Sequence, residues 1–311
     1  MTELISKFIP IFILLLTGFL LRKTGLLTKN FVDDIKKLIV TITLPATLFI
    51  SFLTMELKSS YISLFIATIA YCFLLFFAGI IFKRSKICVH PYSEFFYTGF
   101  EFGMVGVALF SSLFGAENLY AILLLGLGHE LFIWFFYVPA LQFKSEGKLN
   151  ILSVIRSFLS SPLIIAILSA LLFNLSGAFE AVDKYRITEG ALRAFQMVAD
   201  MTSPLILLVI GFQLKFEKTG LKESFKLIGL RLLVVWVLGL LFMFITDAYI
   251  MKLDTLMRNA FITFIVLPPP FVIPVFLPKS EKKANQFYNN ALVIYTVVTL
   301  ILYITIMMIL A

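Results

Sequence analysis

Long uninterrupted runs of apolar residues, separated by short charged linkers, dominate this chain. Hydrophobic residues make up 60% of the sequence and charged residues 14%, whereas charged residues form about a quarter of an ordinary soluble domain. Within lipid, only helices and closed barrels satisfy their own backbone hydrogen bonds. Barrel strands would alternate in polarity over about ten residues, and these runs do not. We therefore expect an all-α polytopic membrane protein.

The number of expected helices follows from the length of the runs, because a spanning helix needs roughly twenty mainly apolar residues. The sequence predicts about ten, and the short linkers predict one membrane transport domain over residues 1–311. The expected helices cover residues 4–22, 31–55, 61–82, 94–114, 119–143, 151–173, 190–214, 227–250, 256–277 and 285–310.

The net charge of +8 has a topological explanation. Its basic residues lie in short runs between apolar segments rather than on one soluble face, which argues against nucleic acid binding. Loops after the odd-numbered helices carry 15 Lys and Arg, against 6 on the other side. The positive-inside rule then predicts a cytoplasmic location for loops 83–93 and 215–226, with both termini outside the plasma membrane. The larger set is Arg22, Lys23, Lys29, Lys83, Arg84, Lys86, Lys144, Lys148, Lys215, Lys218, Lys222, Lys226, Lys279, Lys282 and Lys283; the smaller is Lys58, Lys184, Arg186, Arg193, Lys252 and Arg258.

An internal repeat relates residues 1–148 to residues 149–311. The second helix of each half has a Thr-x-Pro turn in the middle of an apolar run: Thr43 with Pro45, and Thr202 with Pro204. Because each half would hold five helices, the second half must enter the membrane inverted. Inverted repeats of this kind are typical of secondary transporters.

Two expected helices have interruptions. Three consecutive prolines followed by a fourth break the helix at 256–277, because proline removes a backbone donor and clashes with the preceding turn. Its repeat partner at 94–114 has Gly103 and Gly106, which permit a break but do not force one. The prolines are Pro268, Pro269, Pro270 and Pro274.

Interrupted helices at membrane depth predict a cavity, since unwound backbone is tolerated only where protein or water covers it. The half-helix after each break would point its N–H groups at an anion, and the freed carbonyls could hold a cation. The alternative interpretation is structural: Gly-x-x-Gly as a tight helix contact and the prolines as a kink.

In these motifs the chain resembles the auxin efflux carrier family of bacterial permeases and plant PIN-type carriers, within the wider bile acid:sodium symporter group. The resemblance rests on the run from Thr43 to Phe49, on Gly103 and Gly106 followed by a Gly115 to Glu117 turn, and on the prolines of the seventh and ninth helices. It implies two inverted five-helix repeats, a scaffold of helices 1, 2, 6 and 7, and a transport domain in which helices 4 and 9 cross. Family substrates are mostly organic anions, from auxin to dicarboxylates such as malate.

The chain departs from the family pattern at two positions. It has Glu101 where the pattern has Asn, and Ala108 where the pattern has the crossover Pro. The family's mode of anion recognition is therefore not transferred intact.

Glu101, His129, Glu130 and Asp200 lie within expected helices, where unpaired charge is costly and usually functional. Glu101 has three interpretations: a proton-coupling acid, a ligand for a cationic substrate or sodium, or a structural carboxyl bonded to a backbone donor. His129 and Glu130 form either a structural pair or a proton relay, since Ile133 rules out a His-Glu-x-x-His zinc motif. Asp200 is expected to cap the disrupted backbone of its helix.

The expected function is secondary transport of a small organic solute, most simply an organic anion, by alternating access where helices 4 and 9 cross. The alternatives are a sodium-coupled symporter or a carrier of a cationic solute and, from another class, a channel or membrane sensor. No enzyme motif is found, and no cofactor or metal is expected beyond proton or sodium coupling. Expected partners are the small-molecule substrate and membrane lipid, with no nucleic acid, and a homodimer is left open. The expected site residues are Thr43, Pro45, Glu101, Gly103, Gly106, Ala108, His129, Glu130, Asp200, Thr202, Pro204, Pro268, Pro269, Pro270 and Pro274.

Overall fold

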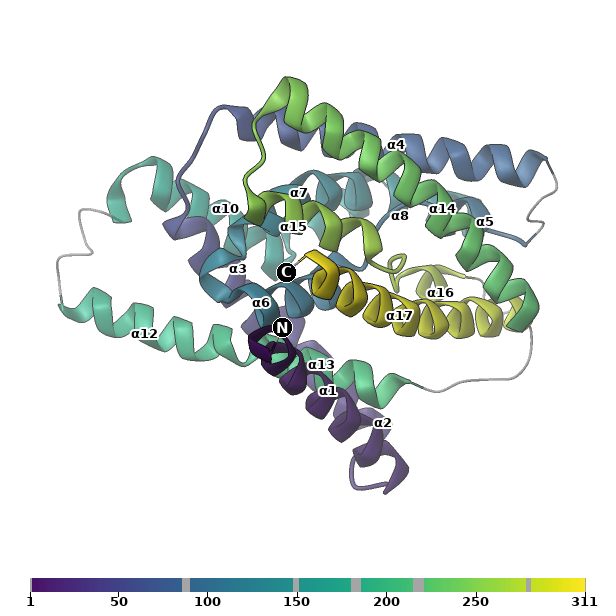
Figure 1. Ribbon diagram of the computed structural model, residues 1–311, viewed down its shortest axis with the longest axis horizontal. Coiled ribbons are helices and arrows are strands. Elements are labelled where there is room, and N and C mark those ends of the chain that lie inside the picture. The colour runs from purple at the N-terminus through teal and green to yellow at the C-terminus, as the bar shows by residue number, and fades with distance from the viewer. Residues whose placement is uncertain are drawn as a thin grey trace. The chain divides into compact units, whose positions relative to one another are not determined.

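The computed structural model describes residues 2–85, 90–147, 151–179, 186–214, 221–277 and 281–310 (Figure 1). The structure is 86% helical, and the residues it describes contain no strand, which confirms the all-α expectation. Several of the basic residues used to predict the topology, among them Lys86, Lys215 and Lys218, lie outside the described residues.

Within the described part of the chain, six helical segments are long and apolar enough to cross a membrane. With the shorter apolar helices beside them, they indicate a multi-pass membrane protein. The six cover Lys29–Thr54, Ser60–Arg84, Tyr120–Ser145, Ile187–Gln213, Leu221–Ile250 and Lys282–Leu310, and the shorter ones cover Phe102–Phe114, Pro162–Leu175 and Thr255–Val266.

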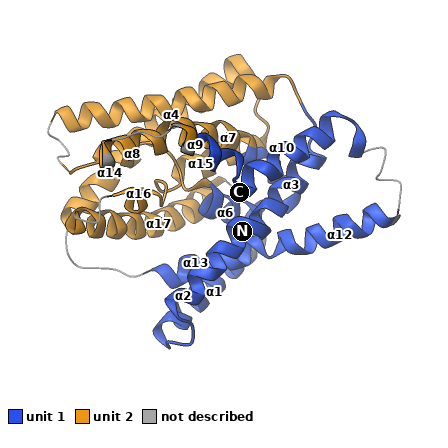
Figure 2. Ribbon diagram, turned by 180° about the vertical axis from the view of Figure 1, so that it is seen from behind, with its two compact units in different colours: residues 1–57, 103–123, 155–214 blue, residues 58–102, 124–154, 215–311 orange. Residues whose placement is uncertain are grey.

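The chain divides into two compact units, coloured separately in Figure 2. Unit 1 comprises residues 1–57, 103–123 and 155–214, and unit 2 comprises residues 58–102, 124–154 and 215–311. Both units therefore draw on both halves of the expected repeat.

Unit 1 is organised by close helix contacts. Helix α1 (Thr2–Lys23) packs along α13 (Thr202–Gln213), and two glycines let their backbones approach. A Cβ on Gly18 would lie 2.1 Å from the Leu208 carbonyl oxygen, and one on Gly211 equally close to that of Leu15. Only glycine fits such contacts, which are common between membrane helices. The remaining helical elements of this unit include α2 (Lys29–Leu38), η1 (Ile39–Thr43), α3 (Leu44–Thr54), α6 (Val107–Phe114), η3 (Ala116–Asn118), α10 (Pro162–Leu175) and α12 (Arg186–Asp200).

Unit 2 has an aromatic core. Tyr71 of α4 (Ser60–Arg84) stacks on Phe100 and Phe242, with ring centroids 6.0 and 4.8 Å away. Its hydroxyl donates to the Val235 carbonyl of α14 (Leu221–Ile245) at 3.1 Å. The other helical elements of this unit include α5 (Ser93–Phe96), η4 (Ile133–Tyr137), α8 (Val138–Glu146), η5 (Thr246–Ile250), α15 (Thr255–Val266), α16 (Ile273–Phe276) and α17 (Lys282–Leu310). Helices α7 (Tyr120–Phe132) and α9 (Ile151–Leu159) and the π-helical η2 (Phe102–Gly106) span unit boundaries.

Helices occupy the predicted positions, but one expected helix is divided where the sequence predicted continuity, and another has a turn where disrupted backbone was expected. The segment at 151–173 divides into α9 and α10, because Ser161 precedes Pro162 and is held extended. The segment at 190–214 begins earlier, at Arg186, and is interrupted at Met201 between α12 and α13.

Candidate functional site

The predicted break in the segment 256–277 is confirmed. Helix α15 ends at Val266, residues 267–270 have no helical structure, and α16 begins at Ile273. Leu267 has ψ 147° and is fully buried, as are the three following prolines. Missing proline N–H groups explain why the helix stops here.

The second break lies earlier than the glycine pair suggested. Helix α5 ends at Phe96, Gly99 has φ +70°, and helical structure resumes at Phe102. Glu101 therefore lies within the break rather than one turn from it. Gly99 decides the position, since a left-handed backbone favours glycine.

Gly103 and Gly106 are themselves helical, as is Ala108 in α6. A Cβ on Gly103 would lie 3.6 Å from the Leu44 side chain, an ordinary contact, so Gly103 is not required for close helix packing. These three residues belong to unit 1, whereas Glu101 and the proline cluster belong to unit 2.

The two breaks cross within unit 2. The Glu101 N–H donates to the Pro268 carbonyl at 2.8 Å, and the Phe271 N–H donates to Glu101 Oε2 at 2.7 Å. A Cβ on Gly99 would lie 2.7 Å from Pro270 Cγ, so the proline ring packs against Gly99 where a larger residue would not fit. The Glu101 carboxylate thus accepts a hydrogen bond from a backbone N–H group of the kind that we expected to bind a substrate anion. Pro274, farther on, lies in the first turn of α16 and accepts from Asn285 through its carbonyl.

His129 contacts the same crossing from α7. Its side chain is almost completely buried, and Nε2 accepts a hydrogen bond from the Phe100 N–H at 2.8 Å. Because Nε2 accepts, the neutral ring carries its proton on Nδ1, which faces Glu130 Oε1 at 3.5 Å. Glu130 Oε2 accepts in turn from Trp134 Nε1 at 3.2 Å. The sequence-predicted pair therefore contacts the break and holds one of its backbone groups.

Arg231 is the site residue that sequence reasoning missed. Its guanidinium donates to the carbonyls of Phe96 at 2.7 Å and Gly99 at 2.8 Å, with a weaker contact to Leu267 at 3.5 Å. It also lies over the rings of Phe100 and Tyr295. Arg231 therefore binds carbonyls from both breaks. Its side chain is fully buried, and no carboxylate among the described residues forms an ion pair with it.

A sequence signal for Arg231 did exist. Arg231 lies between Leu230 and Leu232 and is followed by a long apolar run, whereas Lys222 and Lys226 lie nearer the start of the helix. At 1.5 Å per residue it lies about 15 Å along α14. This distance from the end of the helix, rather than the charge alone, distinguishes Arg231 from a basic residue at the membrane interface.

In unit 1, the two Thr-x-Pro turns lie close together. Thr47, one turn after Thr43, bonds to the Thr202 hydroxyl at 2.8 Å and donates to the Ala199 carbonyl at 3.2 Å. Pro45 is buried, whereas Pro204 is exposed.

The expected capping role of Asp200 is not observed. Its carboxylate is exposed and accepts from Gln196 at 2.7 Å, on its own helix. Residue Met201, which precedes α13, makes no side-chain cap.

The arrangement at the crossing has a part-buried carboxylate on a backbone donor and a fully buried guanidinium on backbone carbonyls. No protein-family model matches the sequence, and no curated protein matches it. Among the described residues, no three His, Cys, Asp or Glu side chains gather in a metal-binding cluster.

Proposed function

We propose that this protein is a secondary transporter of a small organic solute, most simply an organic anion such as a carboxylate, which binds where the two interrupted helices cross. The observation that carries this proposal is the pair of hydrogen bonds joining Glu101 to Pro268 and Phe271. Interrupted, crossing helices place free backbone donors and acceptors at membrane depth, where transporters bind substrates and coupling ions.

The division into units supports alternating access. Unit 1 holds the segments at 4–22, 31–55 and 190–214 and most of that at 151–173, which the resemblance assigns to a scaffold, and unit 2 holds the crossing. Unit 1 also includes residues 103–123, which the resemblance would place with the crossing. The ten-span inverted repeat and the outside location of both termini are part of the proposal.

Glu101 sets the mode of recognition. Its bond to Phe271 N agrees with a structural carboxyl, and it also agrees with a coupling acid that releases this donor when protonated. In the second mode, proton binding at Glu101 frees Phe271 N–H for the carboxylate of the substrate. Arg231 keeps a permanent positive charge nearby, which favours an anionic solute.

A carrier of a cationic solute, or a sodium-coupled symporter, is the second candidate. The observation in its favour is that a carboxylate already holds the backbone donor, so that a cation could bind Glu101 without displacing an anion.

A ligand screen followed by flux measurements tests the proposal. Purified protein is melted with a panel of dicarboxylates, aromatic carboxylates and amines, at two pH values and with or without sodium, because a ligand of the folded state raises its stability. Stabilising compounds are then assayed in proteoliposomes. Saturable uptake with counterflow is expected, whereas flux that does not saturate indicates a channel, and the absence of both binding and flux argues for a sensor.

Orientation is tested on described residues. After Cys72 and Cys88 are replaced, Lys252→Cys should react with an impermeant thiol reagent added to intact cells, whereas Lys222→Cys should not. The reverse pattern would invert the topology.

A further inference from the structure

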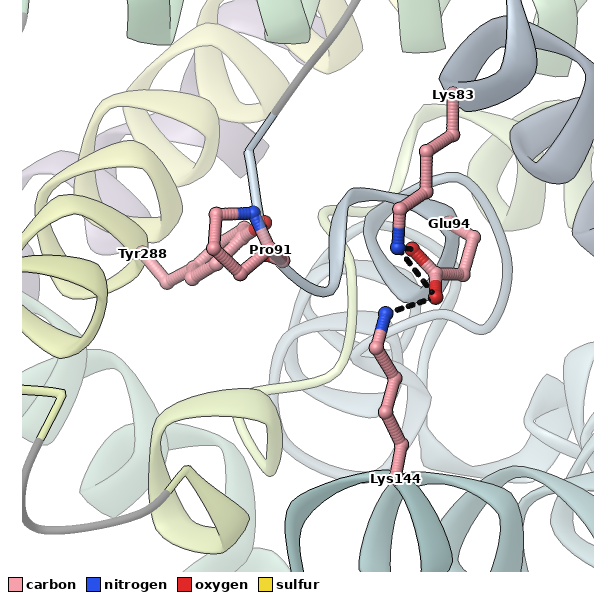
Figure 3. A network of polar contacts seen from close by, with 5 residues as sticks. All are labelled: Lys83, Pro91, Glu94, Lys144 and Tyr288. Atoms are coloured by element: carbon pink, nitrogen blue, oxygen red, sulfur yellow. Dashed lines mark hydrogen bonds and ion pairs between the residues drawn. The ribbon is translucent and has the colours of Figure 1, made fainter.

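A second polar cluster lies in unit 2 at the ends of α4 and α8, away from the crossing residues. Figure 3 shows Lys83 and Lys144 approaching Glu94 from opposite sides. Lys83 donates to both carboxylate oxygens, at 2.8 and 3.0 Å, and Lys144 donates to Oε1. We name these three residues the two-lysine cluster.

The charges in the cluster do not cancel. Two ammonium groups face a single carboxylate, and Arg84 follows Lys83 on an exposed position of α4. His90 adds no further charge near pH 7, because burial lowers the pKa of its ring, although Glu223 opposes part of that shift. Within the two-lysine cluster itself, one positive charge therefore remains in excess.

The lysines retain capacity for another ligand. Each ammonium has three donors, and Lys144 uses one of them on Glu94. The side chains of Lys83 and Lys144 are 35% and 29% exposed, whereas that of Glu94 is 10% exposed. A ligand would thus meet the ammonium groups first and the carboxylate last.

The two helices that carry the lysines also expose apolar side chains, which indicate where the ligand comes from. Phe77 and Ile81 on α4 are 55% and 64% exposed, and Phe143, next to Lys144, is 59% exposed. Such side chains at the end of a membrane helix face acyl chains. A phosphate held by the two lysines would therefore carry its tails along these residues, as in basic lipid sites between membrane helices.

We propose that the two-lysine cluster binds the phosphate of an anionic phospholipid, with Glu94 holding the lysines in place from inside. The site bears on the crossing through α5, which carries Glu94. The same short helix presents the Phe96 carbonyl to Arg231 and the Phe95 carbonyl to Tyr137. The inference stands whether or not the protein transports.

Lipid retention by the purified protein tests this inference. Native mass spectrometry compares phosphatidylglycerol with phosphatidylcholine carrying the same acyl chains. Lys83→Gln and Lys144→Gln should each weaken the retention of phosphatidylglycerol about fivefold, with little change for phosphatidylcholine. Lys36→Gln is the matched control, since Lys36 also pairs with one carboxylate, that of Asp33, and should leave both lipids unchanged.

Three outcomes would overturn the proposal. The first is unchanged retention of phosphatidylglycerol in both lysine variants. The second is displacement of phosphatidylglycerol by excess inorganic phosphate, which would identify a site for a free anion. The third is a loss of retention in Glu94→Gln as large as in the lysine variants, because the Gln oxygen still accepts hydrogen bonds that position the lysines but no longer competes for their charge. The two single lysine variants each test the proposal separately, so a failure of one of them to fold leaves the other to decide the comparison.

Discussion

The two crossing breaks differ in what holds them open. The break at residues 267–270 contains three prolines, so its interruption is fixed by the covalent structure of its own residues. The break at Gly99–Glu101 contains no proline, and its freed groups are held by other helices. Arg231 takes the carbonyls of Phe96 and Gly99, and His129 takes the N–H of Phe100.

This difference shows which residues the crossing depends on. Within a membrane, a backbone group released from a helix needs a replacement partner. A proline run removes donors and so has fewer groups to satisfy, whereas a glycine break leaves both donors and acceptors. The residues that supply partners to the glycine break should therefore be more sensitive than the prolines to substitution.

The largest expected effect is that of Arg231→Met. The variant leaves the carbonyls of Phe96 and Gly99 without their donor in a dry site, which should lower the free energy of unfolding by roughly 3–5 kcal/mol. Arg231→Lys should lose less, because an ammonium still donates. Thermal unfolding of the purified protein measures both. Lys226→Met, an exposed position on the same helix, is the control, and equal melting of Arg231→Met and this control would contradict the assigned role.

Gly99→Ala should have the next largest effect. A Cβ at Gly99 would meet Pro270 Cγ at 2.7 Å and Ile133 Cδ1 at 3.0 Å, at a backbone φ of +70°. A cost of roughly 1–3 kcal/mol is expected from strain alone. Gly103→Ala is the matched control, because its Cβ would make an ordinary contact at 3.6 Å in a helical segment. A larger fall in melting temperature for Gly103→Ala than for Gly99→Ala would show that the break depends on the predicted glycine pair and not on Gly99.

Much of the fold was predictable because its signals are local. Continuous apolar runs predicted the helices, and the proline run predicted one break at the correct residues. The other break was misplaced, since Gly103 and Gly106 suit a helix as well as an interruption, and Gly99 stands out only once Pro270 packs against it. Arg231 was missed because its partners are carbonyls of residues far away in the sequence, which no motif records.

Pro270→Ala should affect function more than stability. The new N–H at position 270 allows more helical structure next to α15 and moves the backbone that contacts Gly99. Transport by the reconstituted protein should fall severalfold, whereas the free energy of unfolding should change by less than about 1 kcal/mol. Pro274→Ala is the control, because Pro274 lies in the first turn of α16, where proline is favoured. Equal transport by both variants would show that the proline break does not shape the site.

Glu101→Gln is expected to change stability least and to be the most informative about mechanism. The Gln side chain keeps an oxygen that can accept from Phe271 N, so only the charge-assisted part of that bond is lost. The variant also imitates a protonated Glu101. Under proton coupling, it should bind and exchange the organic anion found by the ligand screen but lose accumulation driven by a pH gradient. Under recognition of a cationic solute, it should lose binding altogether. Glu130→Gln, which alters a carboxylate beside His129 without touching Phe271, separates these outcomes from a general loss of buried charge. Affinity and pH dependence equal to those of the native protein would leave Glu101 as a structural carboxyl, which satisfies the Phe271 N–H beside the proline break just as Arg231 satisfies the carbonyls of the Gly99 break.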